Sequence, residues 1–391
     1  MAANGKIRTA IIFVSYGPYH IARAKALIQA AEVRPVFIQL AKSIGSHPWQ
    51  PAESCPEPSL KTLSELPFER CGYLELSRLL RKALDEFDPA VVVTASFRPF
   101  IMLSAARWAR SRNRRTVLFY DTTPWDKRRR APVETVKRWT LRRYYDAAFV
   151  GGSVHRDYLK ELGMPEHRIW QPYDVVDNDY FAAKAALVRA DPGRWRKTLG
   201  LPGRYFLYVG RYAPEKNLLR LLEAYALYRE SSAAGWSLVL VGDGPQRSEL
   251  ERYVSSTGLE GVFFKHFAQL ENLPAYYALA GCFVLPSTVD PWGLVVNEAM
   301  ACGLPVIVSK LCGCVPELVR EDANGFHCDP YDTLAIAARL GRMASLDTIS
   351  LQNMGDLSRK IISGFTPRIW ADNLARCVKV TAADNWRGNG S

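Results

Sequence analysis

Two cations and two carboxylates in the second half of the sequence are spaced as a site for a phosphorylated ligand would require. Arg211 and Lys216 are five residues apart, in a turn between the apolar run 205–209 and a segment of helix-forming composition. Across such a turn, a guanidinium fork and an ammonium point charge can converge on one pyrophosphate. Asp290 and Glu298 follow, with seven residues between them, and a carboxylate such as Glu298 can accept two hydrogen bonds from ribose hydroxyls. Taken singly, each is also compatible with an ordinary surface charge.

The elements around Asp290 and Glu298 form one strand–loop–helix–strand unit. Residues 282–285 are a short apolar run ended by a proline, which is typical of a buried parallel strand, and 305–308 are the next such run. Between them, residues 294–302 have helix-forming composition up to a glycine. Asp290 is therefore expected in a loop at the carboxyl end of a strand, where open α/β sheets bind their ligands.

The stretch 287–316 resembles the signature of the retaining GT-B glycosyltransferases of family 4, the glycosyl transferases group 1. That signature has two Glu residues with seven positions between them, and here Asp290 stands in place of the first. Trp292 replaces a Phe of the pattern, and residues 298–303 match it to the letter. The segment 210–217 is similar to the family's G-R-x-x-x-x-K turn. The likeness is strong from 205 to 330 and weaker before 150.

The resemblance implies an α/β fold of the GT-B class, with two Rossmann-like domains that face a cleft. An acceptor-binding domain is expected over 1–185 and a nucleotide-sugar-binding domain over 186–365. A crossover helix that returns to the N-terminal domain, and a tail, are expected over 366–391. The composition agrees with this size, because 391 residues that are 48% apolar suit two α/β domains of about 200 residues each.

The resemblance also implies transfer of a sugar from a nucleotide-diphosphate sugar, expected to be a UDP-sugar, to a saccharide or lipid-linked acceptor. Retention at the anomeric carbon, no metal or other cofactor, and a role in cell-surface polysaccharide or glycolipid synthesis are expected with it. Two alternatives stay open: a GT-B sugar-nucleotide epimerase, and a degenerate member that binds nucleotide sugar without turnover. A nucleic-acid partner is disfavoured because the basic residues form no recognisable nucleic-acid module.

The resemblance assigns roles to the charged residues. Arg211 and Lys216 would stabilise the charge that grows on the leaving diphosphate. Glu298 would orient the nucleotide, and Asp290 would bond a hydroxyl of the donor sugar. Tyr120-Asp121 stands where relatives often carry His-Asp or His-Gly, with the His near the donor sugar. Asp121 either takes over a hydrogen bond to the sugar or acceptor or simply caps a turn.

The remaining donor-site residues are expected to act through their backbone or their position. They are Gly17, Gly210, His266, Trp292, Gly293 and Leu294. Backbone N–H groups of the last three begin a helix, where the dipole favours an anion. Gly17 would bring backbone close to the donor phosphates or the acceptor. His20, in the same loop, either contacts that ligand or caps a helix. His266 stands where relatives have a glycine beside the base.

The net charge of +12 is concentrated in the first half of the sequence. Residues 1–185 hold 29 Lys and Arg against 19 Asp and Glu, and the rest hold 22 against 20. The basic cluster comprises Lys127, Arg128, Arg129, Arg130, Lys137, Arg138, Arg142 and Arg143. We expect it to meet an anionic acceptor or an anionic membrane surface, with Trp125 and Trp139 as interfacial anchors. A solvated basic face is the alternative.

Two further expectations concern location and cysteines. The sequence has no run of 18 uncharged apolar residues and no apolar N-terminal signal, so we expect a cytoplasmic protein, peripheral on the inner membrane face if the basic cluster binds lipid. Of its eight cysteines, Cys302, Cys312, Cys314 and Cys328 gather near His327. Their spacing is too tight for a zinc knuckle, so buried, reduced thiols are expected and a metal site is not.

Overall fold

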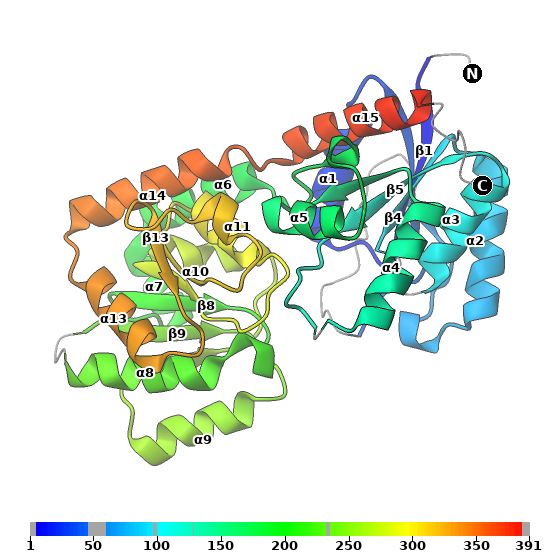
Figure 1. The fold of residues 1–391 in the computed structure, drawn as a ribbon. Coiled ribbons are helices and arrows are strands. Elements are labelled where there is room, and N and C mark those ends of the chain that lie inside the picture. Colours follow the sequence, from blue (N-terminus) through cyan, green and yellow to red (C-terminus); the bar gives the residue numbers. More distant parts are fainter. Residues whose placement is uncertain (1–4, 46–59, 97–99, 128, 232–234, 385–391) are drawn as a thin grey trace. The chain divides into compact units, whose positions relative to one another are not determined.

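The chain folds into two compact units, each a parallel sheet covered by helices (Figure 1). The computed structural model describes residues 5–45, 60–96, 100–127, 129–231 and 235–384. The first unit comprises Met1–Val175 and Pro367–Ser391, and the second comprises Val176–Thr366. The expected tail after the last helix, from 385 on, lies outside the described residues, as does Arg128 of the basic cluster.

Within the described residues, the first unit has a seven-stranded parallel sheet in the order β3-β2-β1-β4-β5-β6-β7. Its strands are β1 Ile7–Phe13, β2 Val33–Gln39, β3 Leu60–Thr62, β4 Val91–Ala95, β5 Arg115–Tyr120, β6 Ala147–Val150 and β7 Ile169–Trp170. Short apolar runs form these strands because both faces of the sheet are covered, and every residue of β6 is buried.

Helices of the first unit lie on both faces of its sheet. They are α1 Pro18–Ile28, α2 Tyr73–Phe87, α3 Phe100–Ser111, α4 Ala131–Tyr144, α5 Ser153–Glu161 and α15 Pro367–Ala383, with the 3₁₀ turns η1 Phe68–Arg70 and η2 Glu166–Arg168. Leu118 and Tyr120 of β5 pack against α4 and α5. Phe119, between them, points to the other face and meets Trp370 of α15. The C-terminal helix therefore returns to the N-terminal sheet, as expected, and packs beside α1.

The described part of the second unit builds a six-stranded parallel sheet in the order β10-β9-β8-β11-β12-β13. Its strands are β8 Tyr205–Val209, β9 Ser237–Val241, β10 Val262–Lys265, β11 Cys282–Leu285, β12 Val306–Ser309 and β13 Gly325–Cys328. Its helices are α6 Asn178–Ala190, α7 Pro192–Leu199, η3 Pro214–Lys216, α8 Leu218–Glu230, α9 Arg247–Thr257, α10 Leu273–Leu279, α11 Leu294–Ala301, α12 Val315–Leu318, α13 Thr333–Ala344 and α14 Thr348–Ile362.

Helix α6 places the start of the second unit before the boundary that the sequence suggested. We expected the first domain to run to 185, in the middle of this helix. Instead α6 packs on α10 and α11, and Phe181 is buried with its ring 6.2 Å from that of Tyr277. Its apolar side chains are therefore part of the second core, and the division falls at Val175 and Val176.

Both sheets have the strand order of a doubly wound nucleotide-binding fold. Counted within each unit, the order runs 3-2-1-4-5-6, with one more strand at the end in the first unit. From the central pair the chain winds outward in opposite directions, so loops diverge where those two strands end. These switch points lie between β1 and β4 and between β8 and β11, and ligands bind at such points in open α/β sheets.

Candidate active site

An ion pair between Lys216 and Asp290 lies at the switch point of the second sheet. Lys216 ends the turn η3 that follows β8, and Asp290 lies in the loop that follows β11. Lys216 Nζ is 2.6 Å from Asp290 Oδ2, and the side chains are only 19% and 9% exposed. Adjacent strands therefore bring together a cation and a carboxylate that are 74 residues apart in the sequence.

The surroundings keep Lys216 charged. Burial lowers the pKa of its ammonium group, but the charge of Asp290 and the hydrogen bond between them outweigh burial, so the pKa of Lys216 is raised. Removing one partner from a buried pair strands the other charge away from water, which is costly. Lys216 is thus a cation held in place before any ligand binds, and a bound anion could replace Asp290 as its counter-charge.

Asn217 fixes the turn that carries Lys216. Its backbone has a φ of 61°, and its side-chain Nδ2 donates to the carbonyls of Pro286, at 3.1 Å, and Pro330, at 2.7 Å. Asn is one of the few residues that adopt this left-handed conformation readily. The loop after β8 is therefore tied to the loop after β11, which holds Lys216 opposite Asp290.

Arg211, the second predicted phosphate ligand, is paired with Glu215. Arg211 Nη2 lies 2.6 Å from Glu215 Oε1, in a pair whose side chains are 51% and 36% exposed. Burial raises the pKa of Glu215, but a backbone hydrogen bond and Arg211 lower it more, so the carboxylate stays ionised. Our reading of the sequence gave no role to Glu215, although its position four residues after Arg211 was an available signal. Each predicted phosphate cation thus has a carboxylate partner.

Glu298 is buried and held by a residue that the sequence did not suggest. It lies in α11, is 1% exposed, and accepts a 2.8 Å hydrogen bond at Oε2 from the hydroxyl of Tyr277. Tyr277 belongs to α10, which packs beside α11. No spacing in the sequence relates a tyrosine on one helix to a glutamate on another, so only the tertiary contact reveals this partner.

The three residues predicted to offer backbone N–H groups, Trp292, Gly293 and Leu294, differ in their surroundings. Gly293 caps the helix at a φ of 95°, and a Cβ there would lie 3.0 Å from Leu285 Cδ2, so the position favours glycine. Among the described residues, the N–H groups of Gly293 and Leu294 donate no hydrogen bond. The side chain of Trp292 points inward. It is 3% exposed, and its indole Nε1 donates to Asn297 Oδ1 at 2.9 Å. Its indole supports the loop.

Gly210 and His266 also follow strand ends of this sheet. Gly210 comes directly after β8 with a φ of 150°, and a Cβ there would lie 2.7 Å from the hydroxyl oxygen of Tyr208. His266 comes directly after β10, and its side chain is 82% exposed. Its Nδ1 lies 3.5 Å from Asp243 Oδ2. Both residues are thus at the carboxyl edge that carries Lys216 and Asp290.

Residues predicted from the first half lie at the corresponding edge of the first sheet. Gly17 begins α1 in an extended conformation, with a φ of −96°, that any residue can adopt, so a special need for glycine is not supported there. Its N–H donates to His20 Nδ1 at 3.0 Å, which makes His20 a helix cap. Asp121 is exposed directly after β5, next to the buried Tyr120.

Comparison with known proteins agrees with this arrangement. Residues 193–360 match the family described as glycosyl transferases group 1. Arg211, Lys216, Asp290 and Glu298 all lie inside this matched segment.

The curated relatives match over part of their length. O-antigen chain mannosyltransferase B of Escherichia coli is 36% identical over 138 residues, which is 35% of this chain and 35% of that protein. The 2-deoxystreptamine glucosyltransferase of Streptomyces kanamyceticus is 33% identical over 192 residues, 47% of this chain and 48% of that protein. The chain thus spans about a third to a half of the length of these two relatives.

Solved structures show the fold of the whole chain. A structure of Anabaena Alr3699/HepE in complex with UDP and glucose has a TM-score of 0.74 at 17% identity, covering 96% of this chain and 100% of that one. Sucrose-phosphate synthase from Thermosynechococcus elongatus has a TM-score of 0.77 at 21% identity, covering 97% and 100%. The fold is therefore GT-B, with two Rossmann-like domains.

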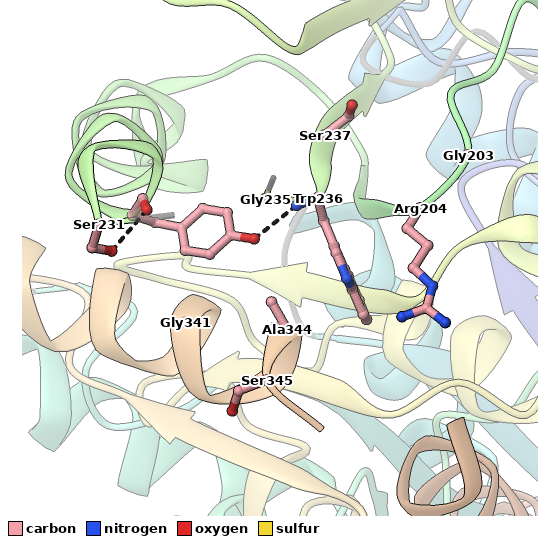
Figure 2. Close-up of a pocket in the computed structure, with 10 residues that line it drawn as sticks. Gly203, Arg204, Ser231, Gly235, Trp236, Ser237, Gly341, Ala344 and Ser345 are labelled. Atoms are coloured by element: carbon pink, nitrogen blue, oxygen red, sulfur yellow. Dashed lines mark hydrogen bonds between the residues drawn. The ribbon is translucent and has the colours of Figure 1, made fainter. Parts of the chain in front are cut away.

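A cavity of about 730 Å³ in the second unit is separate from the candidate site. Figure 2 shows Arg204, Trp236 and Ser345 at its wall. Arg204 and Trp236 come directly before β8 and β9, so the cavity lies at the amino edge of the sheet, opposite Lys216. Arg204 Nη2 donates to Thr348 Oγ1 at 3.3 Å, and the backbone N–H of Trp236 donates to the Tyr228 hydroxyl at 2.7 Å. We assign it no part in the chemistry.

The cysteines near the candidate site are buried thiols. In the described residues seven cysteines are free, and all but Cys71 are buried. Burial raises the pKa of the Cys312 thiol well above its usual range, so it stays protonated. Among the described residues, no group of three His, Cys, Asp or Glu side chains could hold a metal ion.

Proposed function

We propose that this chain is a glycosyltransferase that moves a sugar from a nucleotide-diphosphate sugar to a saccharide or lipid-linked acceptor, with retention of configuration. The observation that carries the proposal is the Lys216–Asp290 pair at the switch point of a Rossmann-like sheet, inside a glycosyl transferases group 1 region. Cell-surface polysaccharide or glycolipid synthesis is the context we propose. UDP is the first nucleotide to test, because the Anabaena neighbour was solved with UDP and glucose.

In this proposal the diphosphate takes the place of two carboxylates. Lys216 exchanges Asp290, and Arg211 exchanges Glu215, for oxygens of the leaving diphosphate. Positive charge that is already in place then stabilises the negative charge that develops as the sugar departs. Asp290, freed from Lys216, can accept a hydrogen bond from a hydroxyl of the donor sugar. Gly293 and Leu294 offer further N–H groups to phosphate at the start of α11.

The buried Glu298 is proposed to orient the nucleotide. Its carboxylate has two oxygens, and Tyr277 holds one of them by a 2.8 Å hydrogen bond. Binding of a ribose hydroxyl then costs little side-chain entropy, because the accepting carboxylate is already ordered in the free protein. His266, exposed at the end of β10, is proposed to lie beside the base.

Activity without a metal ion is part of the proposal. Arg211 and Lys216 supply the positive charge that a divalent cation would otherwise bring to the diphosphate. We expect a chelator to leave the rate of transfer unchanged, and a loss of turnover in chelator that is restored by magnesium or manganese would overturn this part of the proposal.

The test begins with binding and ends with turnover. Thermal denaturation with UDP, GDP and ADP, and with their sugars, should pick out one nucleotide, since a ligand at about 100 times its Kd stabilises by about 2.7 kcal/mol. With that donor, Arg211→Ala and Lys216→Ala should each lower kcat by roughly 100-fold or more. Arg252→Ala, which removes an exposed cation elsewhere in the second unit, is the matched control.

The outcomes separate the proposal from its alternatives. Release of an epimer or of free sugar without any acceptor would indicate an epimerase or a hydrolase. Nucleotide-sugar binding without turnover, over a panel of acceptors, would indicate a binding protein. Near wild-type rates in both alanine variants would contradict the assignment of the two cations.

A further inference from the structure

Helix α4 presents apolar side chains to solvent although it is part of the first unit's core. Only Thr140 and Leu141 of the helix are buried, and Leu141 packs with residues of α5. Val136 is 62% exposed and Trp139 is 57% exposed. They are three positions apart and therefore share one side of the helix, away from Leu141. The exposed tryptophan and valine together give this side of the helix a small apolar patch.

The structure divides the basic cluster into two groups. Arg129 pairs with Glu134 and Glu161, and Lys137 pairs with Glu134. The charges of these two cations are therefore balanced by carboxylates of the protein itself. The other group, here named the free cations, makes no ion pair within the described part of the chain. The free cations are Lys127, Arg130, Arg138, Arg142 and Arg143.

One of the free cations, Arg143, lies beside the exposed apolar residues. Arg143 is four positions after Trp139 and so lies on the same side of α4. Its guanidinium is 5.4 Å from the ring centre of Tyr144, whose ring also contacts Trp139 edge-on at 5.7 Å. The face thus combines a tryptophan, a valine and an exposed guanidinium on one helix.

The charge of each unit points to an anionic partner for this face. By the observed division, the first unit holds 32 Lys and Arg against 19 Asp and Glu, a net charge of +13, and the second holds 19 against 20. A bilayer with anionic lipid offers negative headgroups above an apolar layer, which matches free cations interleaved with Trp139 and Val136. Among the described helices, none is long and apolar enough to cross a membrane.

We propose that the outward face of α4 binds the surface of a bilayer that contains anionic lipid, with Trp139 and Val136 at the headgroup boundary and the free cations over the headgroups. This proposal does not rest on the proposed glycosyl transfer. It predicts adsorption to one leaflet that weakens with salt, because the Debye length falls as ionic strength rises.

A vesicle assay with a charge variant tests the electrostatic part. One Lys or Arg near an anionic surface is worth about 1 kcal/mol, which is about fivefold in partitioning. The triple variant Arg130→Gln, Arg142→Gln, Arg143→Gln should therefore bind vesicles of one third phosphatidylserine or phosphatidylglycerol about 100-fold more weakly than wild type. The control variant carries Arg194→Gln, Lys197→Gln and Arg252→Gln, three exposed cations of the second unit, and should bind like wild type.

Fluorescence tests the apolar part. Lipids brominated near the headgroup quench a tryptophan that enters the boundary. Trp139, which is 57% exposed on the proposed face, should be quenched strongly when the protein binds. Trp139→Phe should abolish most of the quenching, while circular dichroism and the melting temperature stay at wild-type values because the side chain is exposed.

The proposal is overturned by several distinct results. Equal binding to anionic and to pure phosphatidylcholine vesicles, or binding that ignores salt, would remove the electrostatic basis. Equal binding of the triple variant and wild type, or equal quenching in Trp139→Phe, would move the contact away from α4. Binding of a double-stranded oligonucleotide together with no binding of vesicles would assign the face to nucleic acid. None of these assays needs a nucleotide sugar, so their outcome is independent of the proposed function.

Discussion

Replacing Asp290 by asparagine should destabilise the free protein and strengthen nucleotide binding at the same time. The substitution keeps the size of the side chain but leaves Lys216, 19% exposed, without its counter-charge. Breaking a buried ion pair from one side costs about 3–5 kcal/mol. We expect the lower end, about 3 kcal/mol, because Lys216 keeps some contact with solvent.

The expected loss can be converted into a melting temperature. The second unit has 191 residues, and in a domain of that size 1 kcal/mol corresponds to about 2–4 °C. The transition of the second unit should therefore fall by about 6–12 °C in Asp290→Asn. Asp322→Asn is the matched control, because the pair of Asp322 with Arg342 is more than half exposed on both sides and should be worth less than about 1 kcal/mol.

Nucleotide binding should change in the opposite direction. In the wild type a diphosphate has to displace Asp290 from Lys216, whereas in Asp290→Asn it meets an uncompensated cation. We expect the Kd of the free nucleotide diphosphate to fall by about 10-fold, a coupling of about 1.4 kcal/mol, and the stabilisation by nucleotide to grow accordingly. Titration calorimetry and melting curves with and without nucleotide measure both effects.

A double variant separates the pair from the loop that carries it. Asp290→Asn with Lys216→Met removes both charges and should recover most of the stability of the free protein, since the stranded charge is gone. It should bind nucleotide more weakly than wild type, because Lys216 no longer offers a cation to the diphosphate. The reasoning is refuted if Asp290→Asn melts within 2 °C of wild type, or if its affinity for free nucleotide is unchanged or weaker.

Four further variants probe the same site. Glu215→Gln frees Arg211 from a half-exposed pair, so calorimetry should show nucleotide bound up to about fivefold more tightly, and weaker binding would mean that the carboxylate positions Arg211 rather than competes with the ligand. Tyr277→Phe removes the hydrogen bond to Glu298 and should raise the donor KM about fivefold, equivalent to about 1 kcal/mol, while kcat stays near wild type. Glu298→Gln should weaken donor binding by about 1–3 kcal/mol. An unchanged KM in both variants would exclude a ribose contact. Asp290→Glu restores the residue usual in the family and should alter the choice among donor sugars more than the affinity for free nucleotide; equal effects on nucleotide and nucleotide-sugar binding would rule out a sugar contact.

The sequence by itself determined the local units of the second domain. Apolar runs of four or five residues, a proline or glycine at their ends and a helix-forming stretch are local signals, and they placed β8, β11, α11 and β12 to within a residue or two. The residues at the strand ends followed, because in a strand–loop–helix unit the loop at the carboxyl end is fixed once the strand is known. Together with the resemblance of their motifs to the family signature, these units allowed Arg211, Lys216, Asp290 and Glu298 to be named without a structure.

Which of these residues meet was decided by the tertiary structure alone. Lys216 reaches Asp290 because β8 and β11 are neighbours, and strand order depends on pairing between distant segments, which no local period records. The same reason hid the bond from Tyr277 to Glu298 and the membership of α6 in the second core. It also hid which cations near α4 are neutralised by Glu134 and Glu161, since a charge count does not say which side chains face one another. A sequence lists groups that can do chemistry, and packing selects their partners.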